Sequence, residues 1–155
     1  MKMNNKNIIV KINQLVTSFF SEANFQRTFH LDEGSFINYY LIIDDYLGIE
    51  MNIDFMDRLI SFYMIKLDNG KPYQYGYSTN SKAGTIRLHM QSILKYYNFP
   101  FDKKKSVQLM YFRENEDALI ECIKENFQLY TPIFQNEKSV LSELHHPEVW
   151  EKIKQ

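Results

Sequence analysis

Imidazole and carboxylate groups come closest together in His145-His146-Pro147-Glu148, near the C-terminal end of the chain. Such groups are common ligands of zinc and other transition metals. A structural site needs about four ligands, however, and two adjacent histidines on a helix cannot both point at one centre. Pro147 also indicates that the pair precedes the start of a helix. We therefore predict no metal site and no cofactor.

Two pairs of carboxylates, Asp44-Asp45 and Asp54/Asp57, are of the kind that a metal-dependent nuclease uses. Helix capping and a solvated surface explain both pairs with fewer assumptions. The chain contains no glycine-rich phosphate loop, no nucleophile elbow and no His-Glu-x-x-His motif. A small nuclease is thus the least favoured function, and we predict that the protein is not an enzyme.

The chain has one cysteine, Cys122, so it cannot form an internal disulfide. Cys122 lies in an apolar helical pattern, where a thiol behaves as a small buried hydrophobe rather than as a nucleophile. Lys11 and Asn13 interrupt the N-terminal apolar stretch, which makes it a poor signal peptide. No segment reaches the roughly 20 apolar residues of a membrane span. These features predict a cytoplasmic protein with no membrane contact.

Charge is sorted into blocks along the chain. The whole protein is near neutral, with 18 Lys and Arg against 19 Asp and Glu. Residues 71–111 nevertheless hold seven basic residues and one acidic residue, whereas residues 32–70 hold eight acidic and two basic residues. A cationic stretch on a near-neutral protein is typical of a local contact with an anionic partner, most often nucleic acid. The alternative is that the acidic block pairs with the basic block, within the fold or in a dimer.

The composition favours long helices in a single packed domain. Hydrophobic residues make up 45% of the 155 residues, while glycine (5) and proline (4) are scarcer than the turns of a β-sandwich or barrel require. The spacing of apolar residues predicts an all-α bundle of five or six helices. We expect helices over 4–23, 35–47, 54–67, 81–97, 114–129 and 147–153, a turn at Asp68–Gly70, an extended piece over 106–112, and either a loop or a short β-hairpin at 71–79.

The predicted helix over 81–97 has an apolar side and a cationic side. Most of its apolar residues gather within one half of the helix circumference, whereas the other half carries Thr85, Gln91, Ser92 and Lys95 and no acidic residue at all. Leu88 and Tyr96 also fall towards this polar half and blur the division. A helix of this kind can lie against phosphates or in a major groove without charge repulsion.

The segments around this helix resemble the N-terminal SAM-like core-binding domain of tyrosine recombinases, the phage integrases. The cap-like segment Tyr77-Ser78-Thr79-Asn80-Ser81 and the preceding Ile53–Tyr63 carry the resemblance, and Ser35–Tyr40 matches an earlier helix. It covers about residues 35–98, so residues 101–155 would be a C-terminal helical extension of a single helical domain over 1–155.

The resemblance implies an all-helical domain that clamps duplex DNA. The catalytic domain of the family, with its Arg/His set and nucleophilic Tyr, has no room in this chain, so the resemblance implies binding without cleavage, in a phage or mobile element. We expect DNA contacts from the helix at 81–97 and from loops at 71–79 and 102–105. The expected contact residues are Lys71, Tyr77, Lys82, Thr85, Arg87, His89, Ser92, Lys95, Lys103, Lys104 and Lys105.

A protein-binding module is the rival prediction. Such a protein would be an inhibitor, immunity or adaptor protein, and a viral origin is one alternative. It would bind its partner through an aromatic and acidic surface and would have no role with nucleic acid. Tyr73, Tyr75 and Tyr77 beside Lys71 fit either base stacking or a protein interface, because tyrosine is enriched in both. Self-association as a homo-oligomer is also left open.

Overall fold

The computed structural model describes residues 5–19, 27–32, 34–73, 84–100, 102, 104, 110–113, 115–135 and 139–154. In chain order these residues form helix α1 (Asn5–Phe19), strands β1 (Arg27–Asp32), β2 (Phe36–Ile42), β3 (Leu47–Asp54), β4 (Leu59–Asp68), β5 (Lys71–Pro72) and β6 (Arg87–His89), and helices α2 (Met90–Tyr96), α4 (Glu116–Phe134), α5 (Val140–Glu143) and α6 (Pro147–Lys154).

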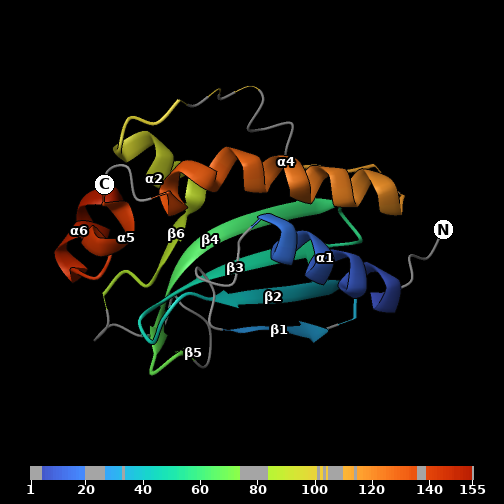
Figure 1. Cartoon of the computed structure of the whole chain (residues 1–155), viewed down its shortest axis with the longest axis horizontal. Helices are drawn as coiled ribbons and strands as arrows, with labels where there is room; N and C mark the ends of the chain where they lie inside the picture. Colours follow the sequence, from blue (N-terminus) through green and yellow to red (C-terminus); the bar gives the residue numbers. More distant parts are fainter. Residues whose placement is uncertain are drawn as a thin grey trace.

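A curled antiparallel sheet forms the centre of the fold, so the predicted all-α class is wrong (Figure 1). Strands β1 to β5 are neighbours in chain order, and β6 also pairs with β4. Helices α1 and α4 lie against the same face of the sheet, where most of the core gathers (Figure 1). The protein is therefore a mixed α and β fold with one sheet layer and one helical layer.

The predicted helices over 35–47 and 54–67 are wrong because both segments build strands. Residues 36–42 form β2 and residues 59–68 form β4, with buried and half-buried positions alternating in the first half of each strand. The second half of each strand is buried on both faces, so its apolar residues also recur at helical spacing. Both segments are rich in β-branched and aromatic side chains, which favour strand over helix. The Ser35–Tyr40 and Ile53–Tyr63 segments therefore lack the helices that the recombinase resemblance implies.

Asp54, predicted to cap a helix, stabilises the turn between β3 and β4. Its Oδ1 accepts hydrogen bonds from the backbone N–H groups of Met56 (3.0 Å) and Asp57 (3.1 Å). Asp44 does the same in the turn between β2 and β3. A short carboxylate side chain satisfies backbone N–H groups equally well at a helix start and in a turn, so the residue type alone did not distinguish the two.

The turn at Asp68–Gly70 is confirmed, but it joins two strands rather than ending a helix. Asn69 and Gly70 have φ angles of 50° and 76°, the positive values that a tight hairpin turn requires. Strand β5 follows at Lys71–Pro72 and pairs back with β4, so this hairpin spans the Asp68–Gly70 turn and is not one within 71–79. Residues 74–79 lie outside the described part of the chain.

The predicted helix over 81–97 is correct only in its second half, α2. Residues 87–89 are strand β6, which pairs with Tyr63–Ile65 of β4, and residues 81–83 are not among those described. Of the predicted extended piece at 106–112, the described residues are 110–112. They lie beside the start of β4, where Tyr111 makes a bridge with Leu59.

The helices at both ends of the chain are confirmed as α1, α4 and α6. Helix α4 begins as predicted, with Glu116 and Asp117 in its first turn and the Asn115 side chain accepting the Ala118 N–H at 2.7 Å. It extends to Phe134, five residues beyond the predicted end. None of the helices among the described residues is long and apolar enough to cross a membrane.

Helix α6 docks on the body of the protein through Trp150. The side chain is fully buried, and its indole N–H donates to the Leu144 carbonyl at 2.7 Å. The ammonium group of buried Lys66 lies 5.0 Å from the centre of the indole ring. Burial lowers the pKa of Lys66, and the ring face offers the cation a compensating contact. Trp150 thus connects the C-terminal helices to β4.

Replacing Trp150 should therefore cost stability in proportion to what is removed. We expect Trp150→Phe to lose about 1–2 kcal/mol of unfolding free energy because the Leu144 carbonyl loses its donor. Trp150→Ala should lose about 3–5 kcal/mol because it leaves a cavity. Urea denaturation followed by far-UV circular dichroism measures both values. Tyr96→Phe, at an exposed ring, is the control, and an unchanged stability of Trp150→Ala would contradict the docking role.

Candidate functional site

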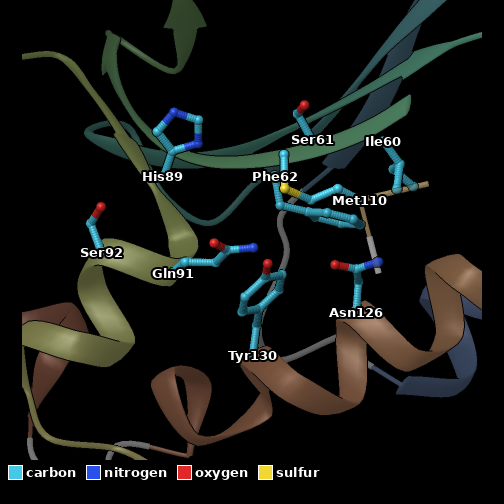
Figure 2. Close-up of a pocket in the computed structure, with 9 residues that line it drawn as sticks. All are labelled: Ile60, Ser61, Phe62, His89, Gln91, Ser92, Met110, Asn126 and Tyr130. Atoms are coloured by element: carbon cyan, nitrogen blue, oxygen red, sulfur yellow. The ribbon is translucent and has the colours of Figure 1, made fainter. Parts of the chain in front are cut away.

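Strand β4 shares its outer edge among separate partners. The Ile60 N–H donates to the Met110 carbonyl at 2.8 Å, and Tyr63–Ile65 pair with β6 further along. Ser61 and Phe62 lie between these partners. Because backbone groups alternate in direction along an antiparallel strand, the Phe62 N–H faces away from β3, as that of Ile60 does. A pocket of about 220 Å³ opens at this break, and we call it the β4 pocket (Figure 2).

The β4 pocket runs from the outer face of the sheet to the helical layer. Its lining residues come from β4, from β6 and the start of α2, from α4 and from Met110. They are Ile60, Ser61, Phe62, His89, Gln91, Ser92, Met110, Asn126 and Tyr130. In Figure 2, Gln91, Tyr130 and Asn126 direct their polar ends towards the space beneath Phe62 and Met110.

The polar groups on the α4 side of the β4 pocket are buried and neutral. Asn126 and Tyr130 are each 3% exposed, and the Asn126 amide donates to the Cys122 carbonyl at 2.8 Å. Tyr130 hydrogen-bonds with Gln91, and burial raises its pKa to about 12. Burial also raises the pKa of the Cys122 thiol to about 12, so the thiol is protonated and buried, as the sequence predicts.

A stack of four side chains, the Arg87 stack, lies on the outer face of the sheet beside the pocket. Arg87 Nη2 is 2.7 Å from Glu50 Oε1, and the guanidinium carbon lies 3.6 Å from the centre of the Tyr63 ring. The His89 ring lies 4.6 Å from the same tyrosine ring. Burial, together with the Arg87 charge, lowers the pKa of His89, so its imidazole is neutral at pH 7.

The Glu50–Arg87 pair joins the acidic and basic blocks of the sequence. Glu50 is 4% exposed, so its carboxylate is buried and needs a charge partner. Internal pairing between the blocks is thus confirmed for this pair. Arg87 is the one arginine among the predicted DNA contacts, and its guanidinium is engaged within the fold.

The other predicted DNA contacts are spread over the molecule. His89 and Ser92 line the β4 pocket, and the Thr85 N–H donates to Glu151 Oε1 at 2.6 Å. Lys71, Lys95 and Lys104 are exposed. Lys71 is on β5 and Lys95 is on α2, which lie at the bottom and at the top of the view in Figure 1. The described contacts therefore do not converge on one surface. Tyr77, Lys82, Lys103 and Lys105 lie outside the described residues.

The C-terminal histidines make contacts of their own. His145 Nε2 lies 2.7 Å from Asp44 Oδ2, and its ring stacks on Tyr46, with the ring centres 5.6 Å apart. His146 Nδ1 lies 4.0 Å from Glu148 Oε1. Within the described ranges, no group of three or more His, Cys, Asp and Glu side chains is placed to hold a metal ion. His145 instead connects the C-terminal helices to the β2–β3 turn.

Strand β1 is an edge strand with a second candidate surface. It pairs with β2 over all of its six residues, and no other strand of the described chain pairs with it. The Ile43 N–H donates to the Leu47 carbonyl, so odd-numbered residues of β2 bond to β3 and even-numbered ones to β1. The register then directs the N–H and C=O groups of Thr28, His30 and Asp32 to the outside.

Glu50 was not identified from the sequence, nor were Asn126 and Tyr130, which line the β4 pocket from α4. Asn126 interrupts the apolar stripe of α4 between Ile123 and Phe127, and a polar residue on a core-facing stripe is a signal that could have been used. Glu50 stands between apolar residues in β3, which is a similar signal. The β4 pocket itself has no signal in the sequence, because its walls come from segments far apart along the chain.

No protein-family model, curated protein or solved structure matches the chain, so the recombinase resemblance is neither supported nor refuted by these comparisons.

The Glu50–Arg87 pair should be energetically coupled. We expect Arg87→Met to lower the unfolding free energy by about 1–3 kcal/mol, less than for a fully buried pair because the Arg87 side chain is 38% exposed. In the Arg87→Met/Glu50→Gln double variant, the loss should be smaller than the sum of the single losses by more than about 1 kcal/mol. Urea denaturation of the four proteins measures this coupling. Lys11→Met, at the solvated Lys11–Glu116 pair, is the matched control, and strictly additive losses would contradict the coupling.

Proposed function

We propose that the protein is a binding module that takes an extended segment of a partner protein onto the open edge of β1. The observation that carries this proposal is the row of outward-directed backbone groups at Thr28, His30 and Asp32. An edge strand with such groups is a template for a further strand, because each pairing group on the edge can bond to the backbone of the added chain.

The sequence of β1 supports this use of the edge. Proteins that protect a free edge place proline, lysine or a bulge in the strand, and Arg27–Asp32 (RTFHLD) contains neither residue and runs in unbroken register. His30 and Leu31 are exposed, and successive side chains of a strand lie on opposite faces. An added strand would therefore find a side-chain contact on each face of the sheet.

DNA binding by a phage or mobile-element protein stays a prediction with less support. It needs several cations on one face, whereas Arg87 pairs with Glu50, and the elements that carry Lys71 and Lys95, β5 and α2, are separated by the sheet in Figure 1. We therefore favour the protein-binding module, without an enzymatic role, over the DNA-binding protein. We also propose that the protein acts in the cytoplasm, since its single cysteine is a buried thiol.

The edge proposal predicts that the His30 N–H, rather than the His30 ring, supports binding. Peptides selected from a displayed 12-residue random library should bind the protein and His30→Ala equally. They should lose at least about tenfold in affinity for His30→Pro, which removes an outward N–H from a position that tolerates proline. Fluorescence anisotropy of labelled peptides measures affinity, and circular dichroism checks that both variants fold.

Hydrogen exchange of the complex supplies the second readout. The amides of Thr28, His30 and Asp32 should become protected when peptide is bound. Equal binding to His30→Pro, peptide contacts that map elsewhere, or a library that yields no binding peptide would overturn the proposal.

The DNA prediction is tested directly by gel shift at several salt concentrations. If phosphate contacts drive binding, duplex DNA should shift at 50 mM salt, and affinity should fall about tenfold or more by 200 mM. The protein-binding module predicts no shift at either salt concentration. A shift with a steep salt dependence that Lys95→Ala weakens would instead favour the DNA-binding protein.

A further inference from the structure

The β4 pocket is too small for a peptide or a drug-sized ligand. Ligand pockets for drug-sized molecules span about 300–1,000 Å³, and a volume of about 220 Å³ corresponds to the liquid volume of about seven waters. A single ring system fits this volume. The pocket is also separate from the open edge, because it lies beyond β4, while β1 is at the other side of the sheet.

The lining of the pocket favours a neutral ligand. None of the nine lining residues carries a formal charge at pH 7, since Tyr130 is protonated and His89 is held neutral beside Arg87. The guanidinium of Arg87, which lies beside the pocket, is directed at Glu50. A charged ligand would lose its hydration without gaining a charge partner, and that loss opposes binding.

The shape and polarity of the pocket favour a planar ring with both donors and acceptors. The Phe62 ring and the Met110 thioether provide a polarisable wall, which suits an aromatic ligand (Figure 2). Next to this wall, the side chains of Gln91 and Asn126 carry amides and that of Tyr130 carries a hydroxyl, and the Tyr130 ring contacts the Phe62 ring, with the ring centres 5.5 Å apart (Figure 2). The backbone N–H of Phe62 faces the same gap. An amide offers both a donor and an acceptor, so the pocket can match both kinds of group on one ring.

We propose that the β4 pocket binds a small neutral heteroaromatic ring, such as a nucleobase or a pyridine carboxamide, beside the Phe62–Met110 wall and within reach of the polar side chains of Gln91, Asn126 and Tyr130. Binding at this place would fill the break in the pairing of β4.

Probes of one size and different charge test the proposal. Adenine, cytosine and nicotinamide should bind at pH 7.5 with Kd values on the order of 1 mM or tighter, which is typical of about ten ligand atoms. Benzoate and benzylamine, which are charged rings of similar size, should bind at least about tenfold more weakly. Ligand-observed and ¹⁵N-resolved NMR on the full chain measure both, and the amides of Phe62, Gln91 and Tyr130 should shift on binding.

Matched variants locate the site. Gln91→Glu places a charge in the pocket and should weaken binding of the neutral probes about tenfold or more, whereas Gln128→Glu makes the same change at an exposed position of α4 outside the pocket and should leave it unchanged. Tyr130→Phe removes only the hydroxyl and should also weaken binding, which keeps the test valid if Gln91→Glu does not fold.

Three results would overturn the proposal: no binding of any neutral probe below about 10 mM, equal binding of the charged rings, or shifts that map away from the pocket. The pocket proposal and the β1 proposal fail independently, because the two sites lie at different edges of the sheet. His30→Pro, which should weaken peptide binding at β1, should bind the neutral probes as the unmodified protein does.

Discussion

Backbone pairing along the outer edge of β4 is the constraint on which the rest of the structure depends. Three described segments share this edge: β5 at Leu67–Asp68, β6 at Tyr63–Ile65 and Met110 at Ile60. The pairings of β6 and Met110 connect the C-terminal half of the protein to the sheet built by the N-terminal half. Because none of the described segments covers the whole edge, Ser61 and Phe62 lie between the described partners, and the β4 pocket opens there. The stability of the fold and the β4 pocket thus have the same origin.

The Arg87 charge is engaged in an ion pair and a ring contact within the fold. The one arginine in the predicted DNA surface neutralises the buried carboxylate of Glu50, and its guanidinium lies over Tyr63. The lowered pKa of His89 belongs to the same stack. A basic block in the sequence is therefore a weak guide to a basic surface, because a β-sheet brings residues 37 positions apart into one ion pair. At the edge of the sheet, the candidate surface on β1 consists of outward-directed backbone groups rather than of clustered cations.

The sequence predicts local features of this protein well and non-local features poorly. Helix α4 was predicted from its acidic first turn and its amphipathic pattern, and the Asn115 cap that the structure shows agrees with both. Strands β2 and β4 were mistaken for helices because apolar residues on both faces match both periods, and Asp54 suits a turn as well as a helix cap. The recombinase-like core at 35–98 depended on those segments being helical. The β4 pocket could not be predicted, because His89 and Ser92 line it only when β6 pairs with β4. Both residues were predicted to be DNA contacts on the basis of helical spacing, but His89 belongs to strand β6.

Native-state hydrogen exchange of single amides tests most directly that exposed pairing edges define the functional surfaces of this fold. The account predicts fast exchange at Phe62 between slowly exchanging Ile60 and Met64, and alternation along β1, with Phe29 and Leu31 slow and Thr28 and His30 fast. Uniform protection along β4 would mean that its outer edge is continuous, and protection of His30 equal to that of Leu31 would mean that the edge of β1 is already occupied. Either result would contradict the account.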